Sequence, residues 1–230
     1  MQVVILCGGK GTRLSEYTDK IPKPLIDVGG KPILLRIMEH YSNFGYNDFI
    51  LCLGYKGNLI KDYFSKSDSQ MKIQFIETGL ESNKAERIQK AKEFIRGESF
   101  FLAYGDDLSD VDINRLLKFH KKNKKIVTLT AVDLTSPFGI IKANKKWEVT
   151  QFREKPKIPQ LMNGGFYVVE KRIFGCIKKG YDLERETFEY LARKKQISAF
   201  YHKGFWKSMN TLKDVIELNE MFLGDRISNK

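Results

Sequence analysis

The chain has 230 residues, of which 42% are hydrophobic, so it is long enough to bury one good core, and we expect a single domain over residues 1–230. A formal charge of +12 suits a nucleic-acid binder, an anionic-membrane binder or an enzyme with phosphorylated substrates. No basic run is interleaved with aromatic residues as a strand-binding groove needs, which argues against nucleic acid as a partner.

The first half of the chain alternates strand-like and helix-like segments. Residues 2–7 are a short apolar run of the kind that is buried on both faces of a parallel sheet, with no basic leader or long apolar segment, so we expect a cytoplasmic protein without a membrane partner. Further segments follow in order: helix 33–41, strand 48–53, helix 58–64, strand 72–77, helix 84–95 and strand 100–104. Such alternation predicts right-handed crossovers and a doubly wound, mainly parallel α/β sheet.

The second half follows a looser pattern. A strand is predicted over residues 126–132, and residues 139–142 and 148–152 form an antiparallel hairpin that turns at 144–146 and is expected to extend the sheet. The remaining elements are strand 166–170, helix 184–194, strand 197–201 and helix 212–222. The expected fold is therefore a mixed, mainly parallel sheet with an added antiparallel hairpin.

A glycine-rich loop follows the first strand directly. Gly8, Gly9 and Gly11 can adopt backbone conformations that let successive N–H groups converge on an anion. The loop is not a Walker loop, because Lys10 is followed by Gly11 rather than by Ser or Thr. An NAD-dependent oxidoreductase is disfavoured as well, since Leu14 stands where the third glycine of that fingerprint is needed.

Two cations follow the loop. Arg13 carries a planar guanidinium that suits bidentate contact with phosphate oxygens. Lys23 stands between Pro22 and Pro24, which fix the backbone and aim the ammonium at little entropic cost.

The combination of a strand, GGKGTRL and KIPKPL resembles the signature of the sugar-phosphate nucleotidyltransferase family, and the resemblance covers nearly the whole chain. It implies a Rossmann-like domain in which Arg13 holds the leaving β- and γ-phosphates and Lys23 bridges the α-phosphate to the incoming phosphate, as the two catalytic residues. The residues expected to bind the nucleotide are Leu6, Gly8, Gly9, Lys10, Gly11 and Thr12.

An acidic cluster closes the strand over residues 100–104. Asp106 matches the metal-binding aspartate of the family's YGD motif, and Mg²⁺ prefers one or two carboxylates together with substrate phosphates. We expect Asp106 to bind Mg²⁺, Asp107 to be solvated, and Asp110 to be the N-cap of a helix that begins after Val111.

Two later motifs resemble those that surround the acceptor in this family. Lys155 is expected to meet the acceptor phosphate, and Glu154 and Asn163, the latter followed by Gly164, are expected to bind its polar groups. If Glu154 and Lys155 stood alone, an exposed hairpin end would be the better interpretation.

The shared stretches HYSNFGYNDFILCLGYKGNLIKDYF and YGDDLSDVDI resemble the CTP-dependent branch of the family. Two departures leave the acceptor open between glucose 1-phosphate and L-glutamine phosphate, the latter from capsule phosphoramidate biosynthesis. Asn210 stands where the branch has an aspartate that completes the metal site, and the segment over residues 66–72 is shorter.

Two further alternatives remain at this point: a UTP- or dTTP-dependent sugar-1-phosphate nucleotidyltransferase, and a non-catalytic nucleotide sensor with the same fold, which Asn210 makes conceivable. Aromatic residues toward the C-terminus favour a homo-oligomer.

Overall fold

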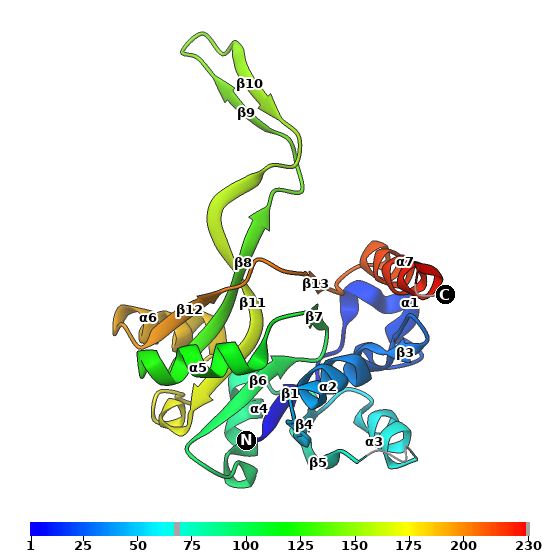
Figure 1. Ribbon diagram of the computed structural model, residues 1–230. Coiled ribbons are helices and arrows are strands. Elements are labelled where there is room, and N and C mark those ends of the chain that lie inside the picture. Colours follow the sequence, from blue (N-terminus) through cyan, green and yellow to red (C-terminus); the bar gives the residue numbers. More distant parts are fainter. Residues whose placement is uncertain (67–69, 229–230) are drawn as a thin grey trace.

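The computed structural model describes residues 1–66 and 70–228, which form helical layers on both faces of a seven-stranded sheet (Figure 1). The strand order is β12-β8-β11-β6-β1-β4-β5. Neighbouring strands are parallel except at β11, which is antiparallel to both β6 and β8. The predicted mixed, mainly parallel sheet is confirmed.

The strands of this sheet match the predicted segments, although two are longer. They are β1 (Val3–Leu6), β4 (Asp48–Leu53), β5 (Lys72–Glu77), β6 (Ser99–Tyr104), β8 (Val127–Thr135), β11 (Lys157–Glu170) and β12 (Ile197–Tyr201). Two short pairs lie outside it, β2 (Asp27–Val28) with β3 (Lys31–Pro32), and β7 (Asp107–Ser109) with β13 (Trp206–Ser208).

Alternate residues of β1 point to opposite faces of the sheet, and both faces are buried, which is why its sequence is apolar throughout. Val3 and Ile5 belong to a core on one face of the sheet, to which α2 (Ile33–Asn43), α3 (Gly57–Ser65), α5 (Ile113–Asn123) and α7 (Leu212–Ser228) contribute. Val4 and Leu6 belong to the core on the other face, with α4 (Lys84–Ala91) and α6 (Glu189–Arg193). A strand that is buried on both faces has no side chain that faces solvent, so all of its positions favour apolar residues.

The helices differ from the predictions mainly at their ends. The segment 84–95 is helical only to Ala91 and continues as a 3₁₀ turn, and the segment 184–194 begins as a π-helical turn, η5 (Leu183–Phe188). The expected N-cap at Asp110 is wrong. Asp112 is the N-cap of α5 and accepts a hydrogen bond from the Arg115 N–H at 2.8 Å, whereas Asp110 stands two residues further from the unpaired N–H groups of that helix.

The predicted hairpin is confirmed, with strands β9 (Ile140–Ala143) and β10 (Val149–Arg153) joined by a turn that Asn144 stabilises. The expectation that it extends the main sheet is wrong. The hairpin connects β8 and β11, which already pair with each other inside the sheet, so it has no sheet edge to join. It projects away from the body instead (Figure 1).

Within residues 1–66 and 70–228, helices are all too short or too polar to cross a membrane. The segment over residues 66–72, which is shorter than in the CTP-dependent branch that the sequence resembles, lies partly outside the described residues.

Candidate active site

A cavity of about 640 Å³ opens where the carboxyl ends of β1 and β6 meet. Ligands of open α/β sheets bind at such strand ends. Residues from every predicted nucleotide and metal motif line it: Leu6, Gly8, Gly9, Gly11, Thr12, Arg13, Lys23, Asp106, Asn163 and Asn210. Lys10 and Gly164 are not among the lining residues.

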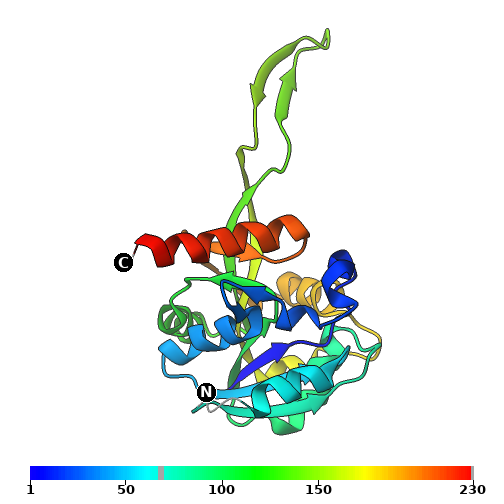
Figure 2. The same ribbon diagram turned by 90° about the vertical axis from the view of Figure 1, so that its right-hand side faces the viewer.

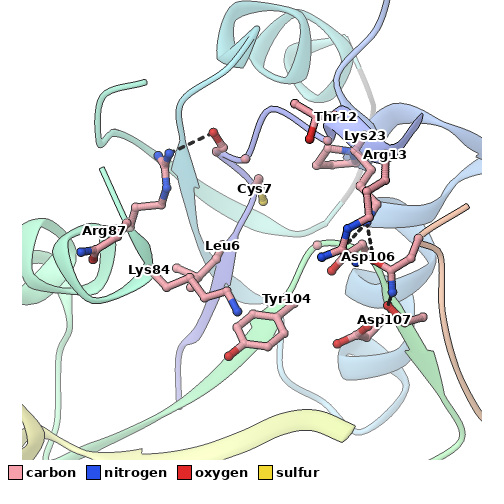
Figure 3. A pocket seen from close by; sticks show the side chains of 18 of the residues that line it. Leu6, Cys7, Thr12, Arg13, Lys23, Lys84, Arg87, Tyr104, Asp106 and Asp107 are labelled. Carbon is pink, nitrogen blue, oxygen red and sulfur yellow. Dashed lines mark hydrogen bonds and ion pairs between the residues drawn. The ribbon is translucent and has the colours of Figure 1, made fainter. Parts of the chain in front are cut away.

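The glycine loop is held in place by Arg87, which the sequence analysis did not single out. Its buried guanidinium donates hydrogen bonds to the carbonyl oxygens of Gly8 (3.0 Å), Leu53 (3.1 Å) and Gly79 (2.9 Å). Figure 3 shows the Arg87 side chain beside the cavity. A β-carbon at Gly8 would lie 2.0 Å from the Arg87 Nη1 atom. Gly8 is therefore required by the close approach of this arginine.

Gly11 is required for a different reason. It adopts a φ of +65°, which favours glycine, and a β-carbon there would lie 2.8 Å from the Thr18 Cγ2 atom and 3.1 Å from the Lys23 Cβ atom. The loop thus turns directly over the segment that carries Lys23.

Three residues that are distant in the sequence meet at the Lys23 ammonium. Lys23 donates hydrogen bonds to Asp106 Oδ2 at 2.5 Å and to Asn210 Oδ1 at 3.2 Å. The Asn210 amide in turn donates to Ser208 Oγ at 2.8 Å, which fixes its oxygen toward the lysine. Pro22 is extended and Pro24 lies within the short 3₁₀ turn that Lys23 begins, so the backbone restraint inferred from the sequence is present.

Arg13 and Lys23 lie together on one side of the cavity, and Arg87 and Lys84 lie on the other (Figure 3). Cations on both sides of a cavity that the glycine loop also lines suit a ligand that carries several phosphates.

The expectation that Asp107 is solvated is wrong. Asp107 is only 6% exposed. It is the first residue of β7, which pairs with β13, and its carboxylate lies next to Gly165. Burial, reinforced by the neighbouring charge of Asp106, raises the pKa of the Asp107 carboxyl to about 7. The pairing of β7 with β13 joins residues 97 to 101 positions apart in the chain and is not visible in the local sequence.

A polar network that the sequence did not reveal forms another wall. Asn163 donates to the Tyr167 hydroxyl at 2.7 Å, and Tyr167 donates to the Tyr104 hydroxyl at 2.9 Å. Tyr104 and Lys84 both contact the Glu184 carboxylate, and the Lys84 ammonium lies 4.3 Å from the Tyr104 ring centroid. Burial raises the pKa of Tyr104, so this hydroxyl stays protonated.

Glu154 and Lys155 lie apart from the other predicted site residues. Both are exposed, between β10 and β11, and neither lines the cavity. Lys155 has a φ of +44°, and the Glu154 carboxylate lies near Gly139 at the base of the hairpin. Their expected contact with an acceptor stays a prediction.

The donor set fits the expected Mg²⁺. One oxygen of Asp106 and one oxygen of Asn210 point to the same position, which the Lys23 ammonium occupies in this structure. Carboxylate and amide oxygens are ligands that Mg²⁺, a hard cation, accepts. In the described part of the chain, three or more His, Cys, Asp or Glu side chains do not gather into a group that could hold a metal.

Comparison with known proteins shows the family to which the chain belongs. The family model described as "Nucleotidyl transferase" matches residues 2–224. A probable glucose-1-phosphate cytidylyltransferase of Bacillus subtilis is 39% identical over 96% of both chains, and a glucose-1-phosphate cytidylyltransferase of Salmonella typhimurium is 37% identical over 96% of both. Among solved structures, HddC from Yersinia pseudotuberculosis superimposes with a TM-score of 0.76 at 26% identity, covering 96% of this chain and 99% of that one.

One cavity thus contains the glycine loop, Lys23 between its two prolines, and Asp106 after β6. The fold is shared with these proteins. This chain belongs to the nucleotidyl transferase family, in its cytidylyltransferase branch.

Proposed function

We propose that this protein transfers CMP from CTP to the phosphate of a small phosphorylated acceptor and releases pyrophosphate. The proposal rests on the position of the Lys23 ammonium, which contacts Asp106 and Asn210 in the cavity that the glycine loop lines. Two anions must meet in this reaction, and a fixed cation between them lowers their repulsion.

In the proposed reaction, an oxygen of the acceptor phosphate attacks the α-phosphorus of CTP. A new phosphoanhydride bond forms, the bond from the α-phosphorus to the oxygen that bridges to the β-phosphorus breaks, and that oxygen leaves with pyrophosphate. Lys23 would contact the α-phosphate and the incoming phosphate, and Arg13 would contact the leaving β- and γ-phosphates. The N–H groups of residues 8–12 would hold the triphosphate.

Asp106 and Asn210 would hold a Mg²⁺ ion, with substrate phosphates supplying further ligands. Mg²⁺ supplies charge neutralisation at the transferring phosphate when it is bound. The Lys23 ammonium, which now contacts both oxygens, would then turn toward the phosphates.

The acceptor is proposed to be glucose 1-phosphate, which the names of the two cytidylyltransferase relatives support. L-glutamine phosphate is a second candidate, and Asn210 is the specific observation that favours it. This neutral amide lines the cavity where the sequence resemblance expects an aspartate. The wall formed by Asn163, Tyr104 and Lys84 would contact whichever acceptor binds.

The deciding experiment measures pyrophosphate release for CTP, UTP, dTTP and ATP, each combined with glucose 1-phosphate, other sugar 1-phosphates and L-glutamine phosphate, with Mg²⁺. We expect strong release only with CTP. Release with UTP or dTTP but not CTP would overturn the base assignment, and no release in any combination would favour a nucleotide sensor.

The metal assignment has its own test, which is the same assay with the Asp106→Ala variant at increasing Mg²⁺. We expect a loss of turnover of at least 100-fold, because the carboxylate is the only charged ligand proposed from the protein. Full activity of this variant would rule out the role of Asp106.

A further inference from the structure

Asn210 is an amide, and the two ends of an amide differ in chemistry. Its oxygen can bind a cation, whereas its NH₂ group carries hydrogens and repels one. The two ends are nearly the same size, so packing does not decide which of them faces the Lys23 ammonium and Asp106. A carboxylate at this position would present an oxygen in either orientation. The use of Asn210 as a metal ligand therefore requires hydrogen-bond partners that select its oxygen.

The main chain around Asn210 is anchored on both sides. Before it, β13 pairs with β7, and the Met209 N–H donates to the Asp106 carbonyl oxygen at 2.9 Å. After it comes α7, the orange and red helix that lies across the body in Figure 2. The Asn210 N–H itself donates to Asp214 Oδ2 of this helix at 3.0 Å. What remains to be set is the orientation of the Asn210 side chain.

Two contacts orient the amide in this structure. Its Oδ1 atom accepts from the Lys23 ammonium at 3.2 Å, and its Nδ2 atom donates to Ser208 Oγ at 2.8 Å. In the proposed reaction Lys23 turns toward the phosphates, so its contact with Oδ1 is lost. The contact with Ser208 remains, and it keeps the NH₂ group away from the metal position.

Ser208 by itself would not select one end of the amide, because a hydroxyl can accept from the nitrogen or donate to the oxygen. Its hydrogen is already in use, however. The Ser208 hydroxyl is hydrogen-bonded to the side chain of Asp107, its direct neighbour across the β7–β13 pair. An ionised carboxylate can only accept, so the hydroxyl donates to Asp107 and offers Asn210 only lone pairs. The amide must then present its NH₂ group to Ser208.

The surroundings of Asp107 suit this role. Asp107 is 6% exposed and lies on the same side of the cavity as Asp106 (Figure 3). Gly165 leaves room for its carboxylate, since a β-carbon there would lie 2.9 Å from Asp107 Oδ2. A buried acceptor that loses its donor is costly, which favours the hydrogen bond from Ser208.

We propose that Asp107 and Ser208 are positioning residues, which select the oxygen of Asn210 as a ligand for Mg²⁺. The Asn210 amide donates to Ser208 and Ser208 donates to Asp107, which leaves the Asn210 oxygen facing the position that Asp106 also faces. This inference rests on the proposed binding of CTP with Mg²⁺. It accounts for a neutral amide at a position where the sequence resemblance expects an aspartate.

The first test measures CTP binding by isothermal titration calorimetry without an acceptor, once with Mg²⁺ and once with EDTA. It is done at pH 8.5, where a carboxyl group with a pKa of about 7 is ionised. The dissociation constant in EDTA divided by that in Mg²⁺, here called the Mg²⁺ ratio, reports what the metal ion adds to the affinity. We expect Ser208→Ala to lower the Mg²⁺ ratio by roughly 3- to 10-fold, the effect of one hydrogen bond, and to leave the affinity in EDTA unchanged.

Ser109→Ala is the matched control. Ser109 lies in the same pair of strands, and its hydroxyl donates to the Phe205 carbonyl oxygen at 2.8 Å instead of contacting Asn210. This variant should have the Mg²⁺ ratio of the native chain. Thermal unfolding of each variant verifies that it is folded.

The second test repeats these measurements in Asn210→Asp, whose two side-chain oxygens are equivalent. Ser208→Ala should then change the Mg²⁺ ratio by less than about twofold, because a carboxylate has no end to select. Asp107→Asn gives Ser208 a hydrogen to accept and frees its hydroxyl to donate to the Asn210 oxygen. Asp107→Asn should therefore lower the Mg²⁺ ratio more in the native background than in Asn210→Asp, since its loss of charge acts in both backgrounds.

An equal effect of Ser208→Ala in the two backgrounds would overturn the proposal, because Ser208 would then act on the fold and not on the amide. An unchanged Mg²⁺ ratio in Ser208→Ala would overturn it while leaving the proposed function in place. A native chain that binds CTP equally well in Mg²⁺ and in EDTA would overturn the proposed metal site, and this inference with it. Pyrophosphate release by the native chain tests the proposed reaction separately.

Discussion

At the residue scale, the ammonium of Lys23 is the feature on which the proposed chemistry depends most. Its side chain is 14% exposed and contacts Asp106 and Asn210, and its backbone stands between Pro22 and Pro24, so the ammonium has only a short way to move when Mg²⁺ takes its place at these oxygens. A cation that is held next to the phosphates stabilises the charge that develops in the transition state.

We expect Lys23→Ala to lower kcat for pyrophosphate release by roughly 100- to 1,000-fold, the range found when one preorganised charge-stabilising group is removed. Lys20→Ala is the matched control, because Lys20 is an exposed lysine of the same segment. Unchanged kcat in Lys23→Ala, with CTP saturating, would rule out the bridging role.

Gly8 and Gly9 are neighbours in sequence and differ in what surrounds them. A β-carbon at Gly8 would meet the Arg87 guanidinium, whereas one at Gly9 would have no atom within 4 Å. Overpacking a buried site costs about 1–3 kcal/mol. We therefore expect Gly8→Ala to lower the melting temperature and to raise the KM for CTP, while Gly9→Ala leaves the melting temperature unchanged; equal effects of the two substitutions would contradict the role of Arg87.

At the element scale, caps decide where helices begin. The Asp112 side chain accepts from the Arg115 N–H, whereas Asp110 lies 2.8 Å from the His202 Nε2 atom and remains largely exposed. Loss of an N-cap side chain costs about 1 kcal/mol, and an exposed polar contact contributes less.

We expect Asp112→Ala to lower the free energy of unfolding by about 1 kcal/mol in urea titrations. Asp110→Ala, the control, should change it by less. A larger effect of Asp110→Ala would restore the cap that the sequence analysis predicted.

At the scale of the whole molecule, the pH dependence of stability reflects buried histidines. His120 lies in α5 and is 3% exposed, and its Nδ1 atom lies 2.9 Å from the Oγ1 atom of Thr128 in β8. Burial lowers the pKa of His120 below 6.5. The charge of Arg172 lowers this pKa further, and the charge of Glu170 opposes the decrease. The pKa of His40 is lowered by burial as well.

A lowered folded-state pKa means that the unfolded chain binds the proton first as pH falls below 6.5. The contribution of His120 to stability is therefore full above that pH and declines toward pH 5.5. We expect His120→Gln to reduce this decline by up to about 1 kcal/mol, measured as the difference in free energy of unfolding between pH 7.5 and 5.5. An identical decline in variant and native chain would show that His120 does not contribute.

The sequence alone determined the order of strands and helices, the mixed sheet and the residues of the loop and of the PKPL segment. These depend on local hydrophobic periodicity, on glycine and on proline, and such signals act within a few residues. The contribution of Lys23, Asp106 and Asn210 to one site was also predicted, from the resemblance of their motifs to those of the family.

Only the tertiary structure decided which groups meet. Arg87 and Gly8, which are hydrogen-bonded, are 79 positions apart, and Asp107 pairs with a residue of β13 that is 101 positions away. The network from Asn163 to Glu184 crosses between strands. The direction of the β9–β10 hairpin was likewise decided by the pairing of β8 with β11, which leaves the hairpin no edge to join. Side chains of such distant segments become neighbours only when the sheet forms, so no local pattern in the sequence encodes their contacts.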